Sequence, residues 1–362
     1  MSLMEVLIAM FVLSIGLLGV AALIPVGRLA IVEAGKADRS GACGRAALSE
    51  IKVRQMLDYR FWAPGAAAPS WWDAVRNAAL PPGPNPQIPF LDAFAIDPLG
   101  VASQMPLNLG GATGSVIAVV PRITLKSFPS LLADPPSTSK LSYDQADRIF
   151  TWHDDLEFSL PKDIKPPPTG DSKRPLVTNP SGSPDFAGHY SWLVTVAPAA
   201  AELALPVADK SLFSVSVVVC YRRSYSISEY GGLPVGEHFA TVEFPPGNVA
   251  YGGGSVRLTW QGDSRDPAVR LRENEWIMLC GKVPDNRCVP PWRTVCKWYR
   301  VVAADTQTDT QSPAHYVSLV GPDWTADSNG DGQLDATAVA IDHVVGVYTT
   351  TVELDRNLVW NK

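Results

Sequence analysis

A run of oxygen-bearing side chains near the C-terminal end of the sequence has the spacing of a calcium-binding loop. Side-chain oxygens stand at positions 1, 3, 5 and 9, and Gly332 occupies position 6, where such loops turn sharply. Position 12, which usually carries a bidentate glutamate, is Ala338, so Asp323 or Asp342 would have to complete the shell. A solvated turn is the alternative, because Asn-Gly and Asp-Gly are common turn dipeptides. The candidate ligands are Asp327, Asn329, Asp331, Gln333 (through its backbone carbonyl) and Asp335.

Other residue types that carry chemistry form no catalytic pattern. The five histidines are scattered, and the sequence has no His-Glu-x-x-His motif, no Gly-x-Ser-x-Gly motif and no phosphate-binding loop. The run Trp152-His153-Asp154-Asp155 could hold a metal or an acid-base pair, but a turn beside a strand explains it as well. We therefore expect a protein that is not an enzyme.

The five cysteines suggest disulfides rather than a cofactor. There is no Cys-x-x-Cys-His for covalent haem and no Cys-x-x-Cys pair for zinc. Cysteines exported into an oxidising space can pair, and Cys280 and Cys296, which flank a Pro-containing loop between two predicted strands, are our first choice. Cys220 and Cys288 leave other connectivities open. Cys43 is expected to be a small buried residue.

The element that dominates the sequence is its apolar beginning. Residues 1–24 are long enough to cross a bilayer, which takes about 20 apolar residues. Glu5 is the one charged side chain among them, and an ionised carboxylate at that depth costs on the order of 2.5–3.5 kcal/mol. If Met1 is exposed by cleavage of a leader, its amine in one copy could pair with Glu5 of a neighbour and set the register of a polymer. A signal anchor or signal peptide is the alternative, although no basic residue precedes the apolar run.

The same helix is predicted to continue to about residue 60. Pro25 and several glycines predict a bent or melted stretch over 16–27, because Pro removes a helical hydrogen bond. Beyond it the sequence becomes mixed and charged. Val53, Met56 and Leu57 have the i, i+3, i+4 spacing of one helical face, which we expect to lie on the head.

The remaining 300 or so residues predict a folded, β-rich head. Pro-dense stretches divide a first part, 61–205, from a second part, 206–362, that has clearer strands. We predict an α+β fold: a long helix packed on an antiparallel sheet. The net charge of −6 argues against general nucleic-acid binding by the head. A local basic patch at Arg222-Arg223 stays open as an exception. The predicted strands are 190–197, 212–222, 239–244, 255–260, 275–280, 295–303, 315–320 and 338–354.

The N-terminal residues also carry a family resemblance. The run Met1-Ser2-Leu3-Met4-Glu5, followed by Ser14-Ile15-Gly16-Leu17-Leu18-Gly19, resembles the mature N-terminus of type IV pilins and pseudopilins. The resemblance implies cleavage and N-methylation by a prepilin peptidase, and a helix that unwinds near Pro25 in the filament. Met1 stands where the family usually has Phe, and the resemblance implies that Met1 is the first residue of the processed chain.

Two further segments extend the resemblance. Parts of the head, such as 190–196, 214–219 and 298–302, are similar to planctomycete pilin-like proteins. The acidic loop is similar to the calcium loops of dockerins and calcium-binding pseudopilins.

The resemblance implies a homo-oligomeric filament subunit, held in the inner membrane before assembly and displayed at the cell surface afterwards, where its head could adhere. The alternatives are a minor pseudopilin of a secretion pseudopilus, and a membrane-anchored head with a binding or enzymatic role.

Overall fold

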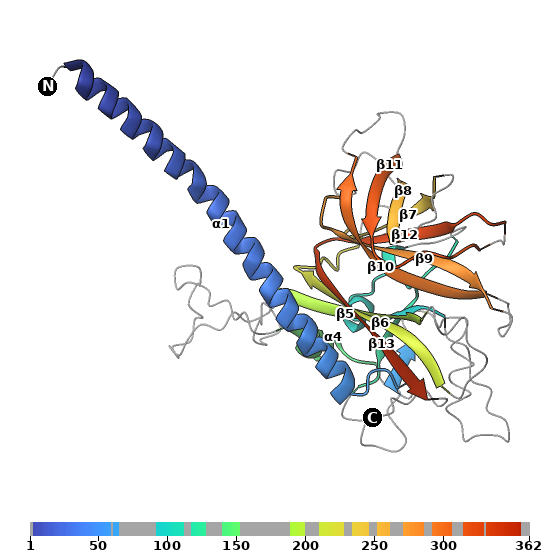
Figure 1. Ribbon diagram of the computed structural model, residues 1–362. Helices are drawn as coiled ribbons and strands as arrows, with labels where there is room; N and C mark the ends of the chain where they lie inside the picture. The colour runs from blue at the N-terminus through green and yellow to red at the C-terminus, as the bar shows by residue number, and fades with distance from the viewer. Residues whose placement is uncertain are drawn as a thin grey trace, which may run out of the picture. The chain divides into compact units, whose positions relative to one another are not determined.

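The computed structural model has the α+β composition that the sequence predicts, with a long N-terminal helix and a β-rich head (Figure 1). The chain divides into two compact units, residues 1–42 and 43–362, and each is described by itself. Met1, Cys288, Asn329 and the run 153–155 lie outside the described residues. The structure describes residues 3–58, 61–64, 92–111, 117–127, 140–152, 189–199, 210–227, 234–245, 252–260, 271–285, 292–305, 314–328 and 331–355.

Helix α1, Leu3–Val53, is continuous and contains Pro25. The bent or melted stretch expected over 16–27 is therefore not unwound in the single chain. A proline removes one backbone hydrogen bond, and the many remaining bonds of a 51-residue helix hold the element together on either side of it.

The C-terminal turns of α1 belong to the head and bury one face of the helix. Cys43, Ala47 and Ile51, spaced four apart, are each 1 % exposed. The prediction that Val53 lies on the buried helical face is wrong, because Val53 is 80 % exposed. The helix ends there, and Gln55 adopts a left-handed φ of 52° that redirects the chain, so Met56 reaches the core from a turn rather than from the helix.

A seven-stranded sheet forms one layer of the head. Its strands run in the order β1-β3-β2-β5-β6-β13, and β4 also pairs with β5. All pairings are antiparallel except that of β2 with β3. The strands are β1 (Trp62–Pro64), β2 (Phe94–Ile96), β3 (Arg122–Leu125), β4 (Thr151–Trp152), β5 (Tyr190–Pro198), β6 (Lys210–Tyr221) and β13 (Val344–Asp355).

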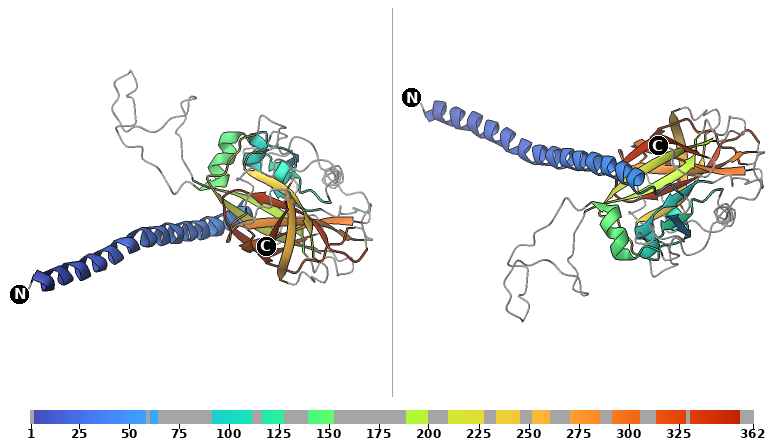
Figure 2. Two further views of the ribbon diagram at one scale, coloured as in Figure 1. Left: turned by 90° about the horizontal axis from the view of Figure 1, so that it is seen from above. Right: turned by 90° about the horizontal axis from the view of Figure 1, so that it is seen from below.

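Both faces of this sheet are covered, which explains why most residues of β5 and the run 217–220 of β6 are apolar. Successive strand residues point to opposite faces. Val217 and Val219 pack in the core that includes Ile51 of α1. Val218, between them, packs in a second core with Met278 of the barrel. In both views of Figure 2 the end of α1 lies against the β5 and β6 region.

The second layer is a closed barrel of six antiparallel strands in the order β10-β11-β8-β7-β12-β9. Closure pairs the edges of its sheet, which removes exposed strand edges. Its own core contains Tyr299 and Trp324. The strands are β7 (Glu237–Glu243), β8 (Gly253–Trp260), β9 (Trp276–Pro284), β10 (Trp292–Ala304), β11 (Ala314–Val320) and β12 (Asp335–Ile341).

The predicted strand over 338–354 is two strands in different sheets. β12 ends at Ile341 and β13 begins at Val344, with His343 between them at a left-handed φ of 62°. The predicted strands at 190–197 and 212–222 are confirmed as β5 and β6, and the structure pairs them antiparallel. This pairing crosses the division drawn from the sequence at 205, and the compact unit 43–362 runs through that point.

Short helices fill the loops of the sheet. α3 (Pro98–Ala102) is capped by Asp97, and η2 (Leu109–Gly111) follows it. α4 (Tyr143–Phe150) begins with a capping box in which Ser142 and Gln145 satisfy each other's backbone N–H groups.

Gly44 allows α1 to approach the sheet closely. A Cβ built at Gly44 would lie 2.3 Å from a ring carbon of Tyr348 on β13. We predict that Gly44→Ala lowers the free energy of unfolding of the head by about 1–3 kcal/mol, because the ring must move. Gly35→Ala is the matched control, since no atom lies within 4 Å of its Cβ position, and helix propensity alone should make it neutral or slightly stabilising. Thermal unfolding followed by near-UV circular dichroism measures both, and equal melting temperatures would contradict the close approach.

Candidate functional site

The apolar part of α1 is exposed to solvent along its length. No part of the most apolar stretch of this helix is buried in the structure. The core helix of a soluble protein, by contrast, is mostly buried. By length and composition the helix could cross a membrane. Leu7, Phe11, Leu17 and Leu23 are examples, each at least half exposed. This surface requires a covering that the described part of the chain does not provide.

Glu5 is exposed on the first turns of α1. The first basic side chain along the helix is Arg28. At about 1.5 Å rise per residue that side chain is far out of reach of Glu5. We expect the amine of Met1 in a neighbouring copy to pair with Glu5, but Met1 lies outside the described residues.

The acidic loop closes on itself through hydrogen bonds. The backbone N–H of Gly332 donates to Asp327 Oδ2 at 2.8 Å, and that of Gln333 donates to Asp331 Oδ1 at 2.7 Å. Gly332 has a φ of 81°, which suits the sharp turn expected at position 6.

Asp335 is turned to a different partner. Both of its carboxylate oxygens accept hydrogen bonds from Ser328, one from the backbone N–H and one from the hydroxyl. Within the described residues, no three His, Cys, Asp or Glu side chains are grouped to hold a metal ion. Asn329, one of the five candidate ligands, is not among them, and calcium binding stays a prediction.

The described cysteines are all free and buried. They are Cys43, Cys220, Cys280 and Cys296. The structure brings the predicted pair together, because Cys280 and Cys296 are direct register partners on β9 and β10.

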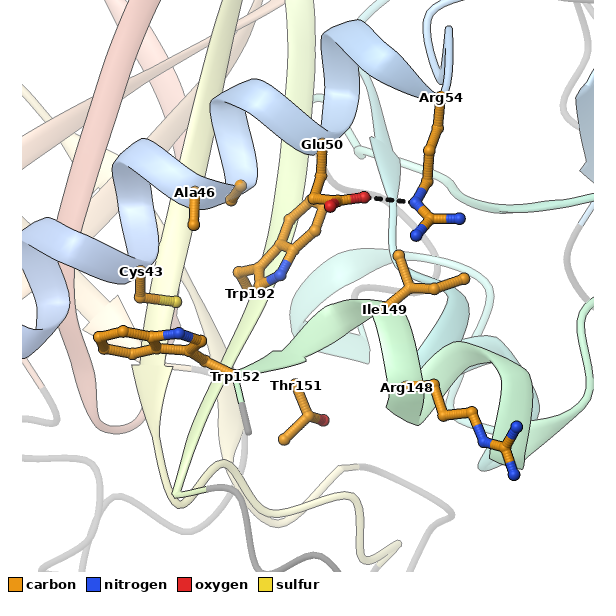
Figure 3. A pocket seen from close by; sticks show the side chains of 10 residues that line it. Cys43, Ala46, Glu50, Arg54, Arg148, Ile149, Thr151, Trp152 and Trp192 are labelled. Atoms are coloured by element: carbon orange, nitrogen blue, oxygen red, sulfur yellow. Dashed lines mark hydrogen bonds and ion pairs between the residues drawn. The ribbon is translucent and has the colours of Figure 1, made fainter. Parts of the chain in front are cut away.

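A pocket of about 400 Å³ lies between the last turns of α1 and the α4–β4 segment (Figure 3). Its apolar wall includes Trp152 and Trp192, and its rim carries the ion pair between Glu50 and Arg54. In Figure 3 the guanidinium of Arg148 points away from that pair. The pocket thus offers an apolar surface without converging catalytic groups. Its lining residues are Cys43, Ala46, Ala47, Glu50, Arg54, Arg148, Ile149, Thr151, Trp152 and Trp192.

The described part of the head contains a buried cluster of four charged side chains, Asp97, Arg122, Arg223 and Glu237. Each of these side chains is at most 1 % exposed. Arg122 pairs with both carboxylates. Two arginines and two carboxylates make the cluster electrically neutral.

Arg223 also contacts both carboxylates of this cluster. Its guanidinium donates to the two oxygens of Asp97 at 2.9 and 2.6 Å, and to Glu237 Oε1 at 2.8 Å. It also lies over the ring of Tyr225, 5.0 Å from the centroid. The basic patch considered at Arg222-Arg223 is therefore absent, because Arg223 points inward.

Backbone groups complete the cluster. The N–H of Gly100 donates to Asp97 Oδ1 at 3.1 Å, and the N–H of Gly110 donates to Glu237 Oε2 at 2.9 Å. Asp97 follows β2 in the sheet, and Glu237 begins β7 in the barrel. The cluster therefore joins the two layers.

The surrounding charges shift the pKa of Asp97. Burial by itself would raise this pKa, but Arg223 and Arg122, with hydrogen bonds from Arg223 and Gly100, outweigh burial and hold it well below its usual range. The carboxylate is therefore ionised throughout the physiological pH range.

The sequence does not predict this cluster because its four members, at positions 97, 122, 223 and 237, are far apart along the chain. The one local signal is Asp97-Pro98, an acidic cap followed by proline at the start of a short helix. That signal predicts the cap but not the arginines.

A comparison of the chain with protein-family models, with curated proteins and with solved structures finds no match. The assignment of function therefore depends on the residues and geometry described above.

We predict that Glu237→Gln lowers the free energy of unfolding by about 3–5 kcal/mol, because it leaves buried arginine charge uncompensated. Glu243→Gln, at the other end of β7, is the matched control. Glu243 pairs with Arg257 at 2.8 Å but is 57 % exposed, so its loss should cost at most about 1 kcal/mol. Urea denaturation of the full chain in detergent measures both variants, and equal costs would show that the cluster does not stabilise the head.

The lowered pKa of Asp97 predicts how stability depends on pH. A group whose pKa falls on folding stabilises the native state above its unfolded pKa, about 3.9 for Asp. That stabilisation is lost as the pH falls through the folded pKa. The difference in unfolding free energy between wild type and Asp97→Asn should therefore be constant above about pH 5 and shrink below about pH 4. Denaturation at a series of pH values tests this, and a difference that grows on acidification would refute it.

Proposed function

We propose that this chain is a structural subunit of a type IV pilus-like extracellular filament. It polymerises through the apolar segment of α1 and displays the β-rich head at the surface. The observation that carries the proposal is the exposed apolar segment with Glu5 as its single charge.

The apolar segment needs an environment that excludes water. Burial of apolar surface contributes roughly 25 cal/mol per Å², and a bilayer or a bundle of identical helices can supply it. Glu5 distinguishes the two, because a carboxylate in lipid has a cost that a positive charge on a neighbouring helix would offset. In the proposed filament that charge is the Met1 amine of the next copy.

The proposal has consequences for processing and location. A prepilin peptidase would cut before Met1, the subunit would wait in the inner membrane, and assembly would move it to the cell surface. The polymer would be a homo-oligomer, and its head would make the outward contacts, including adhesion.

A minor pseudopilin that primes a secretion pseudopilus would use the same helix, and abundance in filaments distinguishes it from a bulk subunit. The pocket beside α1 supports the third reading, a membrane-anchored binding head, because its tryptophan-lined wall could take an apolar ligand.

We predict that Glu5→Gln reduces filament assembly at least tenfold while membrane insertion persists, because the register charge is lost but the apolar surface remains. Glu33→Gln is the matched control, since Glu33 is exposed on the same helix beyond the apolar segment, and it should assemble normally. Filaments sheared from the cells and quantified by mass spectrometry, beside the membrane fraction, provide the measurement. Normal assembly of Glu5→Gln would refute the role of Glu5. Absence of the wild-type chain from filaments would exclude a bulk subunit.

A further inference from the structure

Two cysteines lie opposite each other on neighbouring strands of the barrel. Cys280 on β9 and Cys296 on β10 are register partners. Residues directly opposite in an antiparallel pair have Cα atoms about 4.5–5.5 Å apart, and disulfides join Cα atoms about 4.4–6.8 Å apart. Both side chains belong to one buried cluster, together with Met278 and Trp298, the register partners two positions along each strand, so they point to the same face. We propose that Cys280 and Cys296 form a cross-strand disulfide when the head folds in an oxidising compartment, while Cys43 and Cys220 remain thiols.

Cys220 has different neighbours. It lies on β6, where its register partners are Ser191 and Val344. Burial raises the pKa of its thiol to about 12, and the charges that act on that thiol, Arg223 first, are those of the buried cluster. The pKa of Cys280, by contrast, is raised by burial and then by Cys296. Cys296 therefore lies close enough to Cys280 to affect the pKa of its thiol, as Cys220 does for Cys43.

Cys43 packs in the core on the helix side of the sheet, whereas Cys280 and Cys296 pack in the core on the barrel side. The sheet thus separates Cys43 from the proposed pair.

The bond would form by thiol–disulfide exchange with a disulfide oxidant such as oxidised glutathione. The thiolate of one cysteine attacks the oxidant and releases one reduced thiol, and the second cysteine then displaces the other. The protein loses two protons and two electrons, and the oxidant is reduced to two thiols. Burial raises the pKa of Cys296 to about 12, which disfavours the reactive thiolate in the folded head. The bond is therefore made before β9 and β10 are buried.

The proposed bond would lie beside the contacts between the barrel and the sheet. Trp298, two residues beyond Cys296, donates from its indole N–H to Thr195 Oγ1 on β5 at 2.9 Å. Cys280 also lies opposite Thr337 of β12. A bond between Cys280 and Cys296 would therefore tie together the barrel strands that face the sheet.

The first test is the thiol state of the full chain after export. The protein is denatured, its free thiols are alkylated with iodoacetamide, and it is digested without reduction for mass spectrometry. We expect a peptide pair that links Cys280 to Cys296, with Cys43 and Cys220 alkylated. Alkylated Cys280 and Cys296, or a link from either of them to another cysteine, would overturn the proposal.

The second test compares the full chain made in an oxidising compartment with the same chain made in a reducing cytoplasm, in one detergent. Closing a loop of about 15 residues should raise the melting temperature of the oxidised wild type by roughly 5–10 °C. Cys296→Ala should abolish this difference, and Cys220→Ala, which removes a buried thiol from the same core, should keep it. Loss of the difference in Cys220→Ala, or its persistence in Cys296→Ala, would assign the bond elsewhere.

Discussion

The head depends on four charges that are buried together. Taking ionised side chains out of water costs several kcal/mol each unless they are paired and hydrogen-bonded. Asp97, Arg122, Arg223 and Glu237 meet that condition only when the sheet and the barrel are both in place, because no single element carries all four. The cluster thus allows one arrangement of the two layers and penalises others. We regard it as a device for specificity, since apolar residues could supply comparable stability.

The sheet is the central layer of the head because it packs against the end of α1 on one face and against the barrel on the other. One face receives the small residues of α1, where Gly44 lets the helix come close to Tyr348. The other face packs on the barrel, where Trp298 adds a directed hydrogen bond to Thr195. Because both faces of the sheet are buried, a polar side chain on β6 needs a partner there, as Ser216 has in Thr349, whereas the valines at 217–219 need none.

Helix α1 follows two different packing rules along its length. Its C-terminal turns bury one narrow face, which includes Cys43, Ala47 and Ile51, in the head. Its N-terminal part is apolar all round and exposed in the single chain. An element that is apolar on every side is made for an environment that surrounds it, either lipid or other helices. The proposed filament supplies the second of these environments and gives Glu5 a partner.

The sequence by itself determined the features that depend on local pattern. The apolar helix, the lone charge at Glu5, the strands β5 and β6 and most barrel strands follow from hydrophobic periodicity and β-branched composition. Only the tertiary structure decided which strands belong together, because barrel closure and strand order depend on long-range pairing.

The same distinction holds for individual residues. His343 divides a predicted strand because its backbone adopts a left-handed φ, and the residue type alone does not predict that conformation. Arg223 looks like surface charge in the sequence and is buried in the fold, because its partners are Asp97 and Glu237. The sequence shows which residues are charged, but burial and pairing are properties of the assembled layers.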